Sequence, residues 1–497
     1  MDYLLWSLPF IGVAILIASG RASSVVAGLF GLVAAIAVAL ATEPNPFGPL
    51  DAVLAVARGG WLALFVGSVI FGGLFFRETV SGDAVLGEPV PIRPSLRRKQ
   101  LYTTCFLVGP FAEAATGSGV GQVTIAPILK SIRLAPIYAV LLGLFSQVMV
   151  SWGALANGTI VGSQLAGLSP SDLGVHSAIL TVPLLLAWLG VFWHIAAAAG
   201  VPGTMLDFGA EVTCTMIAGA LLIFSNAMFG PEVAGLAALG PLIAVQFLIG
   251  GQPDRDRWQS VIRFGLPYAA LIAILIATRA IPPVNRVLGQ AIAIRPFADG
   301  PTWFPLLHPS SWLLAIGLVT ALAIGPPALA AGALARAWFR GRKPILTIMC
   351  FLAMAQVMTI SGIAGGLAKG LRLSLGPFAA LATPLFAGLF GFLTSSSSAT
   401  NGLLMPSQAA LAAETHLSLP WLAALQNTAA AAATMLSPVR IAVGCALVGK
   451  PELERAVYSR AWPLGVIPLI VLVAAAAVLL IGFDGLDIAS RLTGLRN

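Results

Sequence analysis

Charged side chains are scarce in this chain: they make up 9% of its 497 residues, against about 25% in a soluble globular domain. Apolar residues reach 58%. This composition cannot supply a water-exposed surface, which excludes an ordinary soluble fold. Apolar runs of roughly 17–25 residues, the length that crosses a bilayer, recur along nearly the whole chain. Because these runs are continuous and backbone groups in lipid must be paired internally, we predict an all-α, polytopic membrane protein.

Cysteine and histidine are also rare, at four residues each. The cysteines lie far apart within apolar runs and form no CxxC pair, and the histidines form no local cluster. We therefore predict no metal site and no cofactor. The sequence contains neither a GxSxG nor an HExxH motif, so an intramembrane hydrolase is disfavoured and we predict that the protein is not an enzyme.

Lys and Arg together outnumber Asp and Glu by 27 to 19. In a soluble protein this excess would suggest nucleic-acid binding, but here the basic residues cluster in short segments, at 93–99, 255–263 and 336–343. Such clustering is typical of cytoplasmic loops. We predict no nucleic-acid partner and a multi-pass protein of the bacterial inner membrane. Counting spans from these loops places the N-terminus outside, and its first apolar run is retained because no cleavage site follows it.

The spans divide the chain into five expected parts. They are residues 1–100 with the first spans and a cytoplasmic loop, 101–168 with a first broken-helix region, 169–343 with intervening spans and an extracellular linker at 281–310, 344–449 with a second broken region, and 450–497 with the last span and tail. Both broken regions are apolar but dense in Gly, Ser, Thr and Pro, which favours interrupted helices.

The two broken regions share a weak internal repeat. At one offset the matching pairs are Phe111 with Phe390, Thr116 with Ser395, Gln122 with Asn401 and Pro127 with Pro406. Each copy is followed by a second polar patch, at 146–159 and at 426–440. Counted from the basic segments, the copies face opposite ways. This predicts two inverted repeats with broken or re-entrant helices that meet at one transport site near the membrane midplane.

Four motifs carry a family resemblance. Gly109-Pro-Phe-Ala-Glu113, followed by Ala115-Thr-Gly-Ser-Gly119, resembles the GPFAEGAAGFGAP-like stretch of the L-lactate and glycolate permease family. Residues 392–401 are similar to that family's FITGSDTSSN, 427–428 to the start of its NTTGG, and 435–443 to its MISPQSIAV. The resemblance implies symport of a proton with a small 2-hydroxy monocarboxylate such as lactate or glycolate.

The departures from the family pattern concern charge. Ser397 stands where the family has Asp, and Arg440 stands where it has Gln. The region has therefore become more positive, which leaves a related or more acidic anion open as the substrate. A sodium-coupled or exchange carrier of another carboxylate, or an anion channel, would use the same broken helices. The expected partners are a small organic anion, a proton and the lipid bilayer, and a homodimer is left open.

Candidate site residues lie in the polar turns of both broken regions. Glu113 is the carboxylate of these turns and is the predicted proton carrier, because ionisable groups inside membrane segments are usually functional. The alternative is a carboxylate wetted at a helix end. Hydroxyls, carboxamides, half-helix amides and a guanidinium can hold a carboxylate. The predicted substrate-binding residues are Thr116, Ser118, Gln122, Ser395, Ser396, Ser397, Ser398, Thr400, Asn401, Asn427, Ser437 and Arg440.

Three of these assignments have structural alternatives. The serines at 395–398 could form only a flexible polar turn. Gln122 could act as a hydrogen-bonding link between helices. Arg440 could extend to the membrane interface, whereas a guanidinium inside the protein could bind a carboxylate through two parallel hydrogen bonds.

Overall fold

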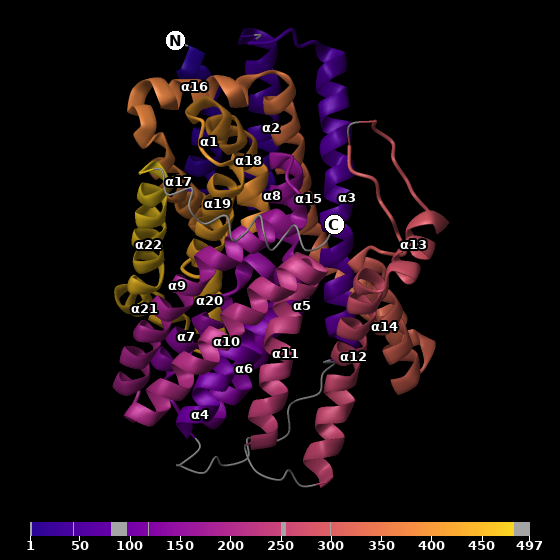
Figure 1. Ribbon diagram of the computed structural model, residues 1–497, viewed down its shortest axis with the longest axis vertical. Coiled ribbons are helices and arrows are strands. Elements are labelled where there is room, and N and C mark those ends of the chain that lie inside the picture. Colours follow the sequence, from indigo (N-terminus) through magenta and orange to yellow (C-terminus); the bar gives the residue numbers. More distant parts are fainter. Residues whose placement is uncertain are drawn as a thin grey trace.

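The computed structural model describes residues 2–42, 44–80, 97–117, 119–249, 255–298 and 300–481. Within these ranges helices are connected by turns and loops, and the strand pairing is limited to one antiparallel bridge between Ile294 and Trp303. Most helices run along the long axis of the molecule (Figure 1). In the described part nine helices are long and apolar enough to cross a membrane, or up to eleven if bent pairs are counted. The predicted all-α, multi-pass membrane fold is confirmed.

Three helices form the N-terminal part. They are α1 (Asp2–Ala18), α2 (Ser24–Thr42) and α3 (Pro49–Val80). Helices α2 and α3 are long and apolar enough to cross a membrane, and α1 is a shorter apolar helix. The basic residues that begin at Arg93 fall partly in 81–96, which lies outside the described residues.

The first broken region contains many short helices. They are α4 (Arg97–Tyr102), the π-helical η2 (Thr103–Val108), α5 (Gly109–Thr116), α6 (Val120–Ser131), α7 (Pro136–Gly143), the 3₁₀ turns η3 (Leu144–Gln147) and η4 (Val150–Trp152), and α8 (Gly153–Ala166). The helical pair on either side of residues 148–149 is bent by 54°. The predicted interruption of this apolar region is therefore confirmed.

Longer helices follow. They are α9 (Pro170–Ala198), α10 (Met205–Phe229), α11 (Pro231–Ile249), α12 (Arg255–Ala280), α13 (Pro282–Ala291), α14 (Pro309–Ile324) and α15 (Pro327–Ile360). The expected linker at 281–310 contains α13, which is bent by 89° from the preceding helix. Its residues are largely exposed.

The second broken region and the C-terminal part complete the chain. Their elements are α16 (Ile363–Leu375), η5 (Gly376–Phe378), α17 (Ala379–Thr394), α18 (Ser397–Thr415), α19 (Leu419–Thr434), α20 (Pro438–Leu447), η6 (Pro451–Leu453), α21 (Glu454–Ala461) and α22 (Pro463–Leu480). Helix α16 lies across the upper end of the molecule (Figure 1). Breaks at 395–396 and 435–437 interrupt the predicted region.

Two details of the sequence interpretation are wrong. Residues 336–343, expected to be a loop, belong to the continuous helix α15, and the chain reverses at 325–326 instead. Arg336 and Arg340 lie one helical turn apart, and both bind the carboxylate of Glu78 on α3. These two arginines therefore lie on the side of a helix and not in a loop. Arg98, expected to be accessible, is buried.

Arg98 is buried because it has a complete set of partners. Its Nε and Nη2 donate to the two carboxylate oxygens of Glu211 at 2.7 and 2.8 Å, and its Nη1 donates to the Val201 carbonyl. Its guanidinium also lies over the Phe192 ring. This bidentate pair joins α4 to α10.

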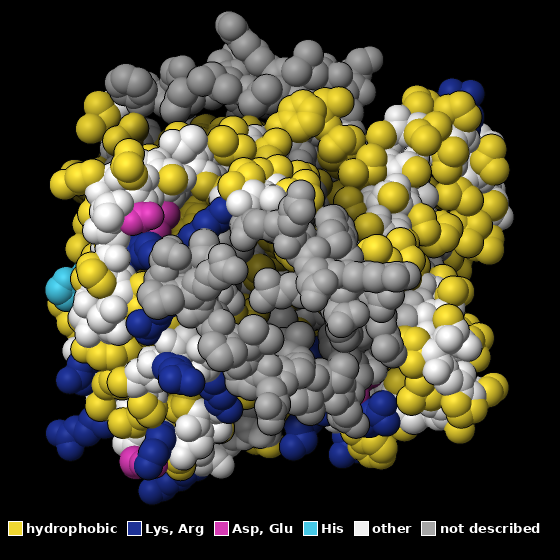
Figure 2. Space-filling model, turned by 90° about the horizontal axis from the view of Figure 1, so that it is seen from below, with side chains coloured by type: hydrophobic (Ala, Val, Ile, Leu, Met, Phe, Trp, Pro, Cys, Tyr) yellow, Lys and Arg dark blue, Asp and Glu magenta, His cyan; other side chains and the backbone are white. Residues whose placement is uncertain are grey.

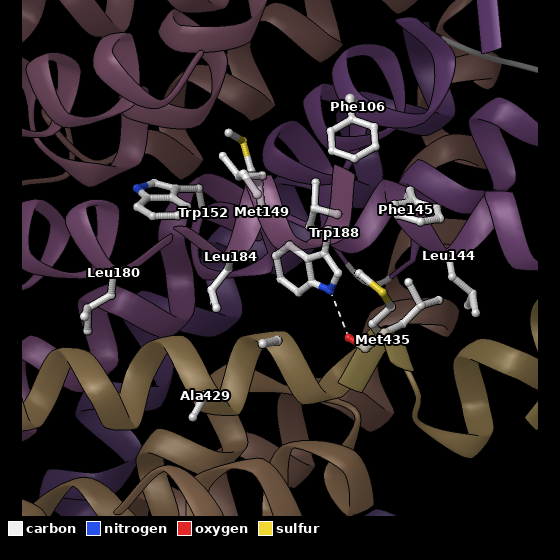
Figure 3. Packing of buried hydrophobic residues seen from close by; sticks show 14 of the residues in the cluster. Phe106, Leu144, Phe145, Met149, Trp152, Leu180, Leu184, Trp188, Ala429 and Met435 are labelled. Atoms are coloured by element: carbon white, nitrogen blue, oxygen red, sulfur yellow. Dashed lines mark hydrogen bonds between the residues drawn. The ribbon is translucent and has the colours of Figure 1, made fainter. Parts of the chain in front are cut away.

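A large apolar core connects the two broken regions. It includes Phe106, Phe145, Trp152 and Met149 from the first region and Met435 from the second, with Trp188 of α9 between them (Figure 3). The buried indole N–H of Trp188 donates to the Leu464 carbonyl at 2.9 Å, which satisfies its polar atom. The core therefore holds the two broken regions against each other.

Candidate transport site

The first break separates α5 from α6 and is built on glycine. Gly117 and Gly119 have φ values of 69° and 82°, a left-handed conformation that side chains disfavour. Space is limiting as well. A Cβ at Gly117 would lie 2.7 Å from the Cβ of Ala154, and one at Gly119 would lie 2.2 Å from Nη1 of Arg440. Ser118, a predicted site residue between them, lies outside the described residues.

The second break separates α17 from α18 and is built on serine. Ser395 is left-handed, with φ 56°, and the Ser396 side chain caps α18 by accepting from the Ala399 amide. Ser437 caps α20 in the same way, accepting from the Arg440 amide. Its hydroxyl also donates to Ser395 Oγ at 2.8 Å. One hydroxyl contact therefore connects the 395 break to the start of α20.

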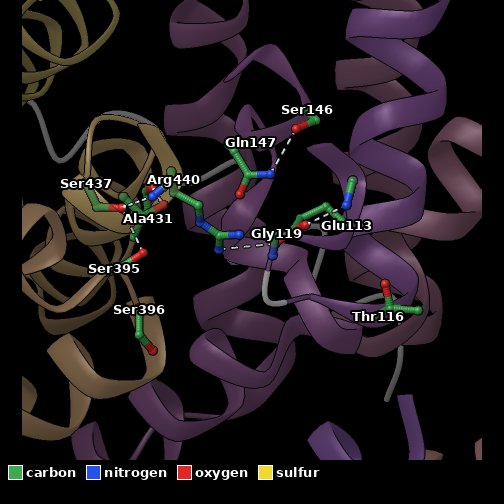
Figure 4. Close-up of polar contacts among 12 residues, drawn as sticks. Glu113, Thr116, Gly119, Ser146, Gln147, Ser395, Ser396, Ala431, Ser437 and Arg440 are labelled. Carbon is green, nitrogen blue, oxygen red and sulfur yellow. Dashed lines mark hydrogen bonds and ion pairs between the residues drawn. The ribbon is translucent and has the colours of Figure 1, made fainter. Parts of the chain in front are cut away.

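Glu113 of the first region and Arg440 of the second form a buried ion pair (Figure 4). Arg440 Nη2 lies 3.4 Å from Glu113 Oε1, and the two residues are 6% and 1% exposed. Glu113 also accepts from the amides of Gly119 and Gly121, each at 3.0 Å. The structure thus brings together the predicted proton carrier and the predicted anion-binding cation. Arg440 points to the interior, and its alternative placement at the membrane interface is wrong.

The Arg440 guanidinium is poorly satisfied for a buried group. Its contact to Glu113 is longer than the roughly 2.7–2.9 Å of a good charge-assisted hydrogen bond. Its Nε has no hydrogen-bond partner among the described residues. Leaving a buried donor unpaired costs about 1–3 kcal/mol, so such a group needs a specific explanation. The guanidinium retains donors that an anion could use.

Two predicted carboxamides connect the broken regions. Asn401 Nδ2 donates to the Gly158 carbonyl and to Asn427 Oδ1, at 2.9 and 2.8 Å. Asn427 Nδ2 donates to the hydroxyls of Thr159 and Ser177, both at 3.0 Å. Their amide hydrogens are thus used to hold helices α8, α9, α18 and α19 together. The Asn401 Oδ1 atom has no partner in the described part of the chain.

Gln122 differs from those two residues because its carboxamide is buried and both of its polar atoms are unpartnered among the described residues. A Cβ at Gly444 would lie 2.5 Å from Gln122 Nε2. Gly444 is one helical turn beyond Arg440 on α20, so Gln122 lies along the helix face that carries Arg440. The interhelical hydrogen bond offered as its structural alternative is absent from the described contacts.

The remaining predicted hydroxyls bond mostly to nearby atoms. Thr116 Oγ1 donates to the Ala112 carbonyl, and Figure 4 shows this residue apart from the ion pair. Thr400 Oγ1 bonds to the Ser396 carbonyl and the Thr394 hydroxyl. Ser397 and Ser398 are buried, and a Cβ at Gly158 would lie 2.4 Å from Ser397 Oγ. This turn therefore packs closely against α8 and is held by its own hydrogen bonds.

Two features of the site were not predicted. Gln147, next to Ser146 in η3, is fully buried near the ion pair, although the sequence indicated only a polar patch there. The second is the left-handed turn of Ala154, Leu155 and Ala156, with φ values of 50–58°. Alanine and leucine rarely adopt this conformation, so the sequence contained no signal for it.

The described charges and dipoles at the site are helix N-termini and one ion pair. Helices α6, α18 and α20 begin at Val120, Ser397 and Pro438, next to the two breaks, and a helix N-terminus carries a partial positive charge. Arg440 adds a full positive charge, which Glu113 balances. The described residues contain no group of three or more His, Cys, Asp or Glu side chains that could hold a metal ion.

Comparison with known proteins shows which family the chain resembles. Residues 308–482 match the family model described as L-lactate permease. The L-lactate permease of Salmonella typhimurium is 24% identical, with 90% of each chain covered, and that of Escherichia coli has the same identity and coverage. A glycolate permease of Escherichia coli is 24% identical over 89% of each chain. These relatives are permeases rather than enzymes, in agreement with the prediction that this protein is a transporter. The chain is thus similar to L-lactate and glycolate permeases along most of its length, and its residues 308–482 match the L-lactate permease family model.

Proposed function

We propose that this protein is a secondary carrier that takes up a small 2-hydroxy monocarboxylate, such as lactate or glycolate, together with a proton. The observation that carries the proposal is the buried pair of Glu113 and Arg440, in which one cation has unused donors beside one carboxylate. The relatives named as lactate and glycolate permeases support this substrate class. Arg440 binds the substrate carboxylate, and Glu113 carries the proton.

Charge balance provides the reason for coupling. The Glu113–Arg440 pair has no net charge, and both residues are almost completely buried. A substrate carboxylate on Arg440 adds one negative charge to a site that is shielded from water, which is unfavourable. A proton on Glu113 restores neutrality and releases the guanidinium from its carboxylate partner. The anion and the proton therefore bind better together than separately, and this mutual preference is the basis of symport.

The arrangement of the breaks supports a single central site. One partner of the ion pair comes from each broken region, and Asn401 and Asn427 of the second region donate to Gly158 and Thr159 of the first. We propose that residues 101–168 and 344–449 are inverted repeats that move relative to each other around this pair. Interrupted helices in corresponding positions of two repeats are typical of such transport sites.

The orientation in the membrane is proposed from charge. Figure 2 shows the lower face of the molecule, where many Lys and Arg side chains and few Asp or Glu side chains are visible. Helix α4 and the start of α12 lie at this end (Figure 1). By the positive-inside pattern, this face is cytoplasmic in the bacterial inner membrane, and the N-terminus, at the opposite end, is outside.

The test is uptake of labelled lactate and glycolate into proteoliposomes that contain the purified protein. An inward proton gradient should drive saturable uptake, and a sodium gradient of equal size should not. Sodium-driven uptake would favour the sodium-coupled alternative, and a non-saturating anion current would favour a channel.

The Glu113→Gln variant separates coupling from binding. It should lose accumulation driven by the proton gradient and retain exchange of labelled for unlabelled substrate. Glu414→Gln is the matched control, because Glu414 pairs with Arg372 near the surface. Proton-driven accumulation at the wild-type level in Glu113→Gln would disprove the coupling role.

A further inference from the structure

The carboxamide of Gln147 has a defined orientation and one unused acceptor. Its Nε2 donates to Ser146 Oγ at 2.9 Å, and the Ser146 hydroxyl donates its single hydrogen to the Gly143 carbonyl at 2.8 Å. Ser146 Oγ can therefore only accept from Gln147, so the NH2 group must face Ser146. The Oε1 atom is left without a partner among the described residues, although Gln147 is fully buried.

This acceptor lies at the ion pair. Figure 4 shows the Gln147 side chain directed toward Arg440 and Glu113, with Ser146 behind it. The packing agrees with this view. A Cβ at Gly121 would lie 3.0 Å from the Cβ of Glu113 and 3.2 Å from that of Ser146. Element η3 is therefore packed against the turn that holds the Glu113 carboxylate.

We infer that Gln147 is a specificity-determining residue that accepts a hydrogen bond from the 2-hydroxyl group of the substrate. This inference rests on the proposed function, in which the substrate carboxylate is bound by Arg440. The hydroxyl is on the carbon next to that carboxylate, so it lies close to whatever surrounds the guanidinium. A 2-hydroxy acid donates to Oε1 and satisfies it.

Two related acids are rejected for different reasons. A 2-oxo acid such as pyruvate presents a carbonyl oxygen, so two acceptors face each other. An unsubstituted acid such as propionate leaves Oε1 buried and unpaired. A site built to hydrogen-bond a hydroxyl discriminates strongly against analogues that lack it. The guanidinium binds the carboxylate that all three acids share, so it cannot discriminate between them. Gln147 provides the preference for the hydroxy acid.

Gln147→Met tests the inference, because methionine has a similar length and no comparable acceptor. The readout is the concentration of unlabelled lactate, propionate or pyruvate that halves uptake of labelled lactate in proteoliposomes. The wild type should favour lactate over both others. The variant should bind lactate about tenfold more weakly, the effect of one lost hydrogen bond, whereas propionate and pyruvate should bind as well as before or better because the unpaired acceptor is gone. Gln100→Met, on α4, is the control and should leave all three values as in the wild type.

Ser146→Ala provides a second and milder test. Without the hydroxyl, the carboxamide is free to rotate and present its NH2 group, so pyruvate should improve relative to lactate. Unchanged selectivity in Ser146→Ala, or an equal loss for lactate and propionate in Gln147→Met, would overturn the inference and leave the proposed function intact. If the wild type transports none of the three acids, the proposed function itself fails.

Discussion

Replacing Arg440 with glutamine removes the positive charge from the site and keeps a polar side chain there. Glu113 does not lose all of its partners, because the amides of Gly119 and Gly121 still donate to its two oxygens. Truncating one member of a buried ion pair usually costs roughly 3–5 kcal/mol, when the other charge is left uncompensated. Here the remaining donors and the 3.4 Å separation reduce that penalty, and we expect the variant to fold.

The effect on binding should be larger than the effect on folding. A hydrogen bond between charged groups contributes about 1.5–3 kcal/mol. Its loss corresponds to a roughly ten- to more than hundredfold weaker affinity for the carboxylate. Arg440→Lys should recover only part of this, since an ammonium group has no planar fork for two parallel bonds. The expected order of affinity is therefore arginine, then lysine, then glutamine.

The assay is substrate-dependent protection against thermal unfolding, combined with the KM of uptake in proteoliposomes. Arg440→Gln should raise the KM at least tenfold, with the melting temperature in the absence of substrate changed little. Arg372→Gln, which removes a surface partner of Glu414, is the control. An unchanged KM and unchanged selectivity in Arg440→Gln would refute the carboxylate-binding role, and the ion pair would then be structural.

Two further predictions concern strain and topology. Ala154→Gly should relieve a left-handed conformation that costs about 1–2 kcal/mol per residue. After the conformational entropy of glycine is subtracted, the free energy of unfolding should rise by roughly 0.5–1 kcal/mol. A lower melting temperature would contradict this prediction. Cysteines placed at Lys99 and Arg342 should react with a membrane-impermeant thiol reagent only from the cytoplasmic side. A cysteine placed at the exposed Pro46 should react only from outside. Labelling of all three positions from one side would reject the proposed topology.

The sequence predicted where the helices are interrupted better than which distant segments contact each other. Small and polar residues inside apolar runs mark both turns, because a membrane helix without them would continue unbroken. Gly117 and Gly119 adopt the left-handed conformation that glycine permits. The sequence also singled out Glu113 and Arg440 as charges in an apolar setting, although 326 residues separate them and no local pattern shows that they meet.

Other features depend on contacts between distant segments. Residues 336–343 read as a loop because four of them are basic, whereas Glu78 of α3 binds two of these arginines on a helix side. The sequence did not single out Gln147. Its distinguishing feature is an Oε1 atom without a hydrogen-bond partner among the described residues, and only the structure shows this. The left-handed turn at Ala154 lies against Gly117 and contradicts the local preference of alanine.

The departures from the family motifs make sense as one change of charge. A site with Glu113, a glutamine at position 440 and an aspartate at position 397 would contain two carboxylates, so an incoming anion would meet like charges. In this chain, Arg440 balances Glu113 directly, and Ser397, packed against Gly158, carries no charge. Under the proposed function, a single proton on Glu113 would then balance a single bound anion. Under the proposed function, the two replacements therefore supply, with a fixed guanidinium, a positive charge that additional protons would otherwise have to provide when an organic anion binds.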